Sequence, residues 1–134
     1  MKDQIDSVKN NFFKWVDEAL TQSTSTQVAA FHFNLYEGKR SVHVQLIGAD
    51  EFVPGDNPET DYWPGDEVFS TGEKIFEIPF AVAGRNWEEW LQVSLRLIMD
   101  YMESGKMSEI LRKSKGVGAG FVDGDMHLVY MHTT

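Results

Sequence analysis

The sequence predicts a single α+β domain over residues 1–134, with helices packed on a mainly antiparallel sheet of about five strands. Three observations support this prediction. Apolar residues recur with the helical period in two long stretches, two other stretches alternate as hairpins do, and no change in composition marks a domain boundary. With 42% hydrophobic residues, the chain can bury a core of its own. The predicted order of elements is α-β-β-β-α-(α)-β-β.

The first predicted element is an amphipathic helix over residues 5–20. Its apolar side chains recur at three- and four-residue steps, and charged residues fall on the opposite side. The apolar stripe consists of Ile5, Val8, Phe12, Trp15, Val16 and Ala19. The Thr-, Ser- and Gln-rich run over residues 21–27 breaks the period and therefore predicts a connector.

A β-hairpin is predicted next, over residues 28–47, with a two-residue type II′ turn at Gly38 and Lys39. Pairing Glu37 with Arg40 sets apolar residues opposite one another on one face. These pairs are Leu35 with Val42, Phe33 with Val44 and Phe31 with Leu46. We expect the other face to be exposed. It carries His32, Asn34, Tyr36, Ser41, His43 and Gln45.

Residues 74–80 predict a third strand, which Pro79 places at an edge of the sheet. A helix over residues 87–103 is predicted from a broad apolar stripe, and we expect its Trp87 and Trp90 in the core. Asn86 and Glu89 form its capping box.

The C-terminal third predicts a short helix over residues 108–113 and a second hairpin over residues 116–130. A two-residue turn at Asp123 and Gly124 would set Val117, Ala119 and Phe121 on one face with Met126, Leu128 and Tyr130. The glycines between Gly116 and Gly120 precede a hairpin turn and not a helix. They therefore predict close packing and not a phosphate-binding loop.

The charge of the chain is concentrated in one acidic segment, Asp50 to Glu73. This segment holds eight of the 21 Asp and Glu residues and none of the 12 Lys and Arg residues. It therefore carries −8 of the net charge of −9. Such acidity argues against nucleic acid as a partner, because phosphate binding relies on Lys and Arg. A macromolecular partner is expected to be basic.

The acidic segment also contains an internal echo, since FVPGDN at residues 52–57 and YWPGDE at 62–67 lie ten residues apart. Each Pro-Gly pair predicts a type II turn, with the preceding aromatic residue as its anchor. We therefore expect an ordered acidic loop of about 20 residues beside the sheet edge, without regular secondary structure.

The sequence predicts neither a metal, a cofactor nor a catalytic set. The carboxylates of the acidic segment lack the spacing of a calcium-binding loop. His32 and His43 lie diagonally across the first hairpin in the predicted pairing, but a zinc site needs a third ligand. The chain has no nucleophile elbow and no kinase signature, so we expect no enzyme.

The cellular compartment is predicted from what the sequence does not contain. It has no cysteine, no apolar run of the length that spans a membrane, and no N-terminal pattern of a secretory signal. We therefore expect a cytoplasmic protein without a membrane segment.

Three stretches of the chain carry a family resemblance: AFHFNLYE at residues 30–37, DYW with DEVF between 61 and 69, and GFVDGD at 120–125. Together they resemble small bacterial immunity proteins of polymorphic-toxin systems. The resemblance covers most of the chain in order, through short motifs. It implies a non-enzymatic cytosolic inhibitor that binds and blocks one toxin domain. The positions matching near such an interface are Asp61, Trp63, Asp66 and Glu67.

The leading hypothesis is an immunity or inhibitor protein that neutralises a basic partner such as a toxin nuclease. Aromatic residues would anchor the partner, and carboxylates would steer it and form ion pairs. The predicted partner-binding residues are Asp56, Glu59, Asp61, Tyr62, Trp63, Asp66 and Glu67. Two alternatives stay open. One is a small-ligand binder or hydrolase that uses carboxylates of the acidic segment in a pocket against the sheet. The other is a structural subunit that dimerises through a sheet edge or aromatic patch.

Overall fold

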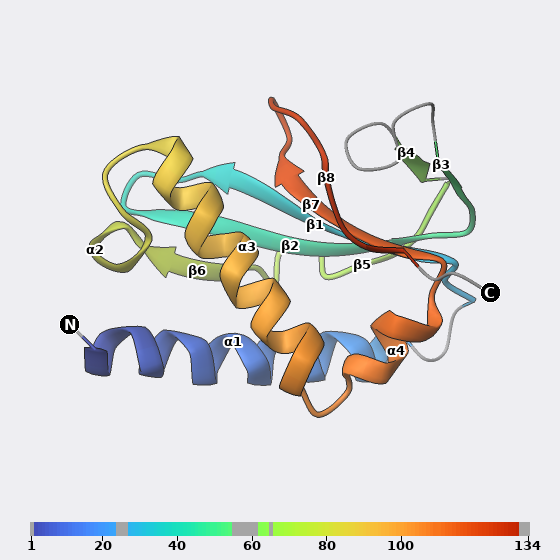
Figure 1. Ribbon diagram of the computed structural model, residues 1–134, viewed down its shortest axis with the longest axis horizontal. Coiled ribbons are helices and arrows are strands. Elements are labelled where there is room, and N and C mark those ends of the chain that lie inside the picture. The colour runs from blue at the N-terminus through green and yellow to red at the C-terminus, as the bar shows by residue number, and fades with distance from the viewer. Residues whose placement is uncertain (1, 24–26, 55–61, 65, 132–134) are drawn as a thin grey trace.

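The computed structural model describes residues 2–23, 27–54, 62–64 and 66–131. Within these ranges the chain has an α+β fold of four helices, a six-stranded mixed sheet and a separate two-stranded sheet, as Figure 1 shows. The α+β class predicted from the sequence is confirmed. Among the helices of the described ranges, none is long and apolar enough to cross a membrane.

The elements follow one another with short connections. The helices are α1 (Lys2–Ser23), α2 (Phe80–Ala83), α3 (Trp87–Ser104) and α4 (Ser108–Lys113). The strands are β1 (Ala30–Glu37), β2 (Ser41–Ala49), β3 (Phe52–Pro54), β4 (Tyr62–Pro64), β5 (Glu67–Ser70), β6 (Phe76–Pro79), β7 (Gly116–Phe121) and β8 (His127–Met131). The predicted strands and helices are present, and β3, β4, β5 and α2 are additions that the sequence reading missed.

The main sheet has the strand order β5-β2-β1-β7-β8, and β6 also pairs with β2. The pairs are antiparallel except for β1 with β7, which is parallel. A mainly antiparallel sheet is therefore correct. Strands β5 and β6 share the same edge of β2, because β5 pairs with its end and β6 with its beginning. The prediction that Pro79 belongs to an edge strand is confirmed.

The core lies between the helices and one face of the sheet. Helix α3 crosses in front of the sheet and α1 runs below it in Figure 1. Phe12 of α1 lies 6.2 Å from Phe33 of β1, measured between ring centroids. The apolar face predicted for the first hairpin is at most 3% exposed. It consists of Phe31, Phe33, Leu35, Val42, Val44 and Leu46.

The first hairpin differs from the prediction in its register. Glu37 pairs with Val42 and Leu35 with Val44, so the strands are offset by two residues from the predicted pairing. A shift of two preserves the faces, because side chains alternate with a period of two. The type II′ turn is wrong as well, since Gly38 does not have a positive φ. The carbonyl of Arg40 instead accepts a hydrogen bond at 3.0 Å from the backbone N of Phe80, the first residue of α2 directly after β6.

The second hairpin is present, but its two-residue turn is wrong. Residues 122–126 separate β7 from β8. Val117 pairs with Tyr130 as predicted, whereas a register shift next to it places Ala119 opposite His127. The backbone explains this difference. The carbonyl oxygen of Asp125 occupies the place that a Cβ on Gly120 would take. The five-residue loop between β7 and β8 can therefore pack directly on the backbone of Gly120.

Candidate functional site

Two hydrogen bonds join the start of the acidic segment, at Asp50, to Asp66 within it. Asp50 N donates a hydrogen bond to Asp66 O at 2.9 Å, and Asp66 N donates one to Asp50 Oδ1 at 2.8 Å. This reciprocal pair joins residues that are 16 apart in the chain. It brings the exposed side chains of Asp50 and Glu51 next to those of Asp66 and Glu67.

The echo within the acidic segment forms two paired strands. Phe52 to Pro54 make β3 and Tyr62 to Pro64 make β4, antiparallel with Val53 opposite Trp63. Figure 1 shows this small sheet above the right-hand end of the main sheet. The prediction of a loop without regular structure is therefore wrong, because the repeated pieces pair with each other. The two predicted Pro-Gly turns lie outside the described residues.

The C-terminal end of the acidic segment is attached to the main sheet and to α1. Thr71 N donates to Leu46 O at 3.0 Å, and Leu46 N donates to Thr71 Oγ1 at 3.2 Å. Trp15 Nε1 of α1 donates to Lys74 O, just past the segment, at 2.9 Å. The described residues at both ends of the segment are thus held by hydrogen bonds.

Phe52 anchors the start of the segment on the sheet. A Cβ built on Gly116 would lie 2.5 Å from the Phe52 ring, so this ring occupies the space above the glycine. Gly116 therefore serves close packing as expected, whereas the turn that Phe52 was predicted to anchor extends outside the described residues.

Four exposed carboxylates of the described residues form what we call the acidic ledge: Asp50, Glu51, Asp66 and Glu67. Two of the predicted partner-binding residues, Asp66 and Glu67, belong to it. The backbones of Tyr62 and Trp63 lie in β4. Asp56, Glu59 and Asp61 lie outside the described residues.

The sheet face opposite the core carries a polar network that links β1, β2 and the turn after β5. Asn34 Nδ2 and Tyr36 Oη donate to Gln45 Oε1 at 3.3 and 3.1 Å. Gln45 Nε2 donates onward to Gly72 O at 3.2 Å. The side-chain amide of Gln45 thus accepts hydrogen bonds through its oxygen and donates one through its nitrogen. It thereby connects β1 and β2 to the turn after β5.

His32 belongs to this network, and its predicted exposure is wrong. It is buried at 8% exposed. Its Nδ1 lies 2.7 Å from Asn34 Oδ1. Burial lowers the pKa of His32 from the usual value of 6.5, and the hydrogen bond to Asn34 opposes that shift without cancelling it. The imidazole is therefore neutral at pH 7, with Nδ1–H donating to Asn34. In the sheet, His32 stands between Ile47 of β2 and Gly118 of β7.

The two histidines of the first hairpin do not converge. His32 stands opposite Ile47 and His43 opposite Tyr36, so the diagonal relation expected from the predicted register is wrong. His43 Nε2 instead lies 3.2 Å from Glu77 Oε1, which also accepts from Ser41 Oγ at 2.9 Å. Across the described ranges, no group of three His, Asp or Glu side chains is placed to hold a metal ion.

A second surface, which the sequence reading missed, surrounds Trp87. This side chain is 58% exposed, so its assignment to the core is wrong. Trp90 is partly buried, stacked on Phe80 at 4.6 Å, and its Nε1 donates to Gly84 O at 2.9 Å. The position of Trp87 in the chain contained the signal. It directly follows the N-cap Asn86, whereas the buried stripe of α3 begins at Leu91.

Comparison with known proteins gives no homologue from which the role of these surfaces could be inferred. No family model, no curated protein and no solved structure matches the chain. The resemblance to immunity proteins stays a prediction, and the function is to be inferred from the contacts and charges of the chain itself.

Proposed function

We propose that the protein is a non-enzymatic binding module that docks a basic protein partner through the acidic segment. The observation that carries this proposal is the hydrogen-bonded pair of Asp50 and Asp66, which gathers the four carboxylates of the acidic ledge. The best-fitting partner is a toxin domain with a positively charged active face, such as a nuclease, and the protein would act as its immunity partner.

The electrostatics of the segment support this proposal. Residues 50–73 contain no Lys or Arg, so no cation within the segment compensates the ledge. Like charges held side by side repel one another, and a basic partner relieves that repulsion when it binds. Charge complementarity of this kind raises the association rate and selects the partner. The same interaction is screened by salt, with a Debye length of about 10 Å at 0.1 M.

The exposure of the ledge favours docking over acid-base chemistry. Carboxylates that act as general acids or bases usually sit in clefts where burial or neighbouring charges tune them. Asp66 and Glu67 are exposed, and their backbones are held by β2 and Asp50. A rigid backbone with accessible charges loses little entropy when a partner binds.

The test is a pull-down of the full chain from an extract of its source cells, at low and at high salt. We expect the wild-type protein to retain a basic protein at low salt and to release it at high salt. The double variant Asp66→Lys/Glu67→Lys should bind the retained protein at least about tenfold more weakly.

A matched control removes the effect of net charge. Glu18→Lys/Glu103→Lys changes two exposed helical carboxylates, so both double variants have a net charge of −5 instead of −9. The control should bind within about twofold of wild type. The proposal fails if no basic protein is retained, or if the two double variants lose affinity equally. Inhibition is then tested directly. The retained protein should arrest growth when it is expressed alone, and co-expression of this chain should restore growth.

A further inference from the structure

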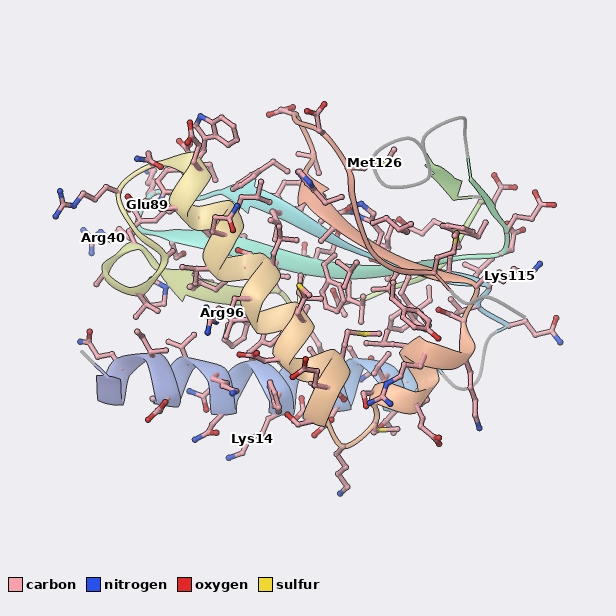
Figure 2. The ribbon with its side chains drawn as sticks, in the orientation of Figure 1. Lys14, Arg40, Glu89, Arg96, Lys115 and Met126 are labelled. Atoms are coloured by element: carbon pink, nitrogen blue, oxygen red, sulfur yellow. The ribbon has the colours of Figure 1, made fainter. Side chains whose placement is uncertain are left out.

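The exposed Trp87 lines a hollow at the opposite end of the β7–β8 hairpin from the small sheet β3–β4. The hollow has a volume of about 900 Å3 and lies between the start of α3 and the hairpin. Figure 2 shows Glu89 on the first turn of α3 and Met126 on the arm of the hairpin. Its walls include Trp87, Leu91, Val93 and Phe121, and we call it the Trp87 cavity.

A second hollow of about 440 Å3 adjoins the first and shares Trp87, Phe121 and Gly124 with it. The indole ring of Trp87 therefore contributes to both. Cavities of roughly 300–1,000 Å3 are the usual size for small-molecule sites. The aromatic surface that they share is the natural contact for a flat ligand group.

The charged residues that line these hollows all have the same sign. Glu88, Glu89 and Asp125 line the Trp87 cavity, and Glu37 and Asp123 line its neighbour. Neither set of described lining residues contains a Lys or Arg. The sites therefore favour a cation and repel an anion.

The cap of α3 takes up the carboxylate of Glu89, one of these acidic residues. Asn86 Oδ1 accepts from Glu89 N at 3.0 Å, and Glu89 Oε1 accepts from Arg85 N at 2.8 Å. Capping thus occupies Glu89 and leaves Glu88 and Asp125, both exposed, as the carboxylates that face a ligand. No ion pair within the described part of the chain involves either of them.

We propose that the Trp87 cavity binds a small organic cation, specifically an alkylguanidinium compound. A guanidinium group is planar, stacks on an indole ring and donates two parallel hydrogen bonds to one carboxylate. Its alkyl portion would contact Phe121 and Val93, while the charged group lies between Trp87 and the carboxylate of Glu88 or Asp125. This site is separate from the acidic ledge, and it does not depend on the function proposed above.

The test uses two probes of nearly identical shape. Butylguanidinium carries the charge and butylurea does not. Binding is measured by calorimetry and by the shift of the Trp87 indole N–H resonance, assigned with Trp87→Leu. We expect butylguanidinium to shift that resonance saturably and to bind at least about tenfold more tightly than butylurea.

Substitutions then separate the aromatic from the ionic contribution. Trp87→Leu should weaken butylguanidinium binding about fivefold, and Glu88→Gln/Asp125→Asn about tenfold. Because these side chains are exposed, the variants should keep the wild-type unfolding temperature within about 2 °C. Asp66→Asn/Glu67→Gln, which changes the acidic ledge, should leave the affinity unchanged.

Three results would overturn the assignment. Equal binding of butylurea would show that charge is not recognised. An unchanged affinity in Trp87→Leu would show that the ligand does not touch the indole. No shift of the Trp87 resonance up to tens of millimolar probe would show that the hollow is not a cation site. None of these results bears on the partner of the acidic ledge.

Discussion

The hydroxyl group of Tyr101 connects three elements, and its removal should be among the most damaging single-atom changes in the protein. Tyr101 of α3 is fully buried. Its Oη donates to Asp17 Oδ1 of α1 at 2.5 Å and accepts from Met107 N at 3.1 Å. Tyr101→Phe deletes both hydrogen bonds while it keeps the ring, which packs edge-on against Phe13 at 5.0 Å.

The magnitude follows from the two bonds. A hydrogen bond to a charged acceptor contributes about 1.5–3 kcal/mol, and a buried amide without its partner costs about 1–3 kcal/mol. The hydrogen bonds to Asp17 and to the Met107 amide are only partly buried. We therefore expect Tyr101→Phe to lose about 3 kcal/mol in the free energy of unfolding. With an unfolding entropy of about 2.1 cal/mol/K per residue, a 134-residue chain should lose about 10 °C in Tm.

The assay is urea unfolding with circular dichroism, and Asp17→Asn is the matched control. Asn keeps an acceptor for the hydroxyl but removes the charge, so it should lose only about 1 kcal/mol. If Tyr101→Phe unfolds within about 0.5 kcal/mol of wild type, the link between α1 and α3 has no energetic role and the reasoning is refuted.

Tyr101 should also make the stability of the folded protein fall at high pH. Burial, and then the hydrogen bond to Asp17, raise the pKa of Tyr101 well above its usual value of 10.0. The folded chain therefore keeps a proton that the unfolded chain releases, so stability should fall as the pH rises above about 10. In Tyr101→Phe the slope of stability against pH should be smaller in this range.

Three further predictions concern His32, the α3 cap and the β7–β8 hairpin. Burial lowers the pKa of His32 below 6.5, so the unfolded chain binds a proton at a higher pH than the folded chain does. The wild-type protein should therefore lose stability as the pH falls from 7.5 to 5.5. His32→Gln should lose less, as measured by urea unfolding at each pH. Asn86→Ala should cost about 1 kcal/mol in thermal unfolding and Asn86→Ser almost nothing; equal losses would contradict the cap. Gly120→Ala should cost about 1–3 kcal/mol, whereas Gly124→Ala, with ordinary space around it, should stay within about 0.5 kcal/mol of wild type by the same measurement.

The long helices could be predicted because their signals are local. The apolar stripe over residues 5–20 lies within α1, and Asn86 caps α3 where predicted. The inward set of the first hairpin was also recoverable, because alternation assigns faces without reference to any other element. The register of this hairpin could not be predicted from its own residues. Ser41 and Val42 pair with β6, and the loop between β1 and β2 is two residues longer than predicted.

The candidate surfaces, too, have features that are local in the sequence and features that depend on distant residues. The concentration of carboxylates between Asp50 and Glu73 was visible in the sequence, as was the FVP and YWP echo. The pairing of those pieces as β3 and β4, and the closure of the segment by Asp50 and Asp66, require residues far apart in the chain to meet. The hollow beside Trp87 likewise depends on where the start of α3 lies relative to the β7–β8 hairpin.

The sequence by itself thus determined the α+β class, the two long helices, the buried face of the first hairpin and the place of the acidity. Period, capping and charge decide these properties, and each acts within a few residues. Only the tertiary structure decided the parallel pairing of β1 with β7, the burial of His32 and the cavity beside Trp87. Each of these depends on which distant strand or helix lies against a residue, and a local pattern carries no information about that neighbour.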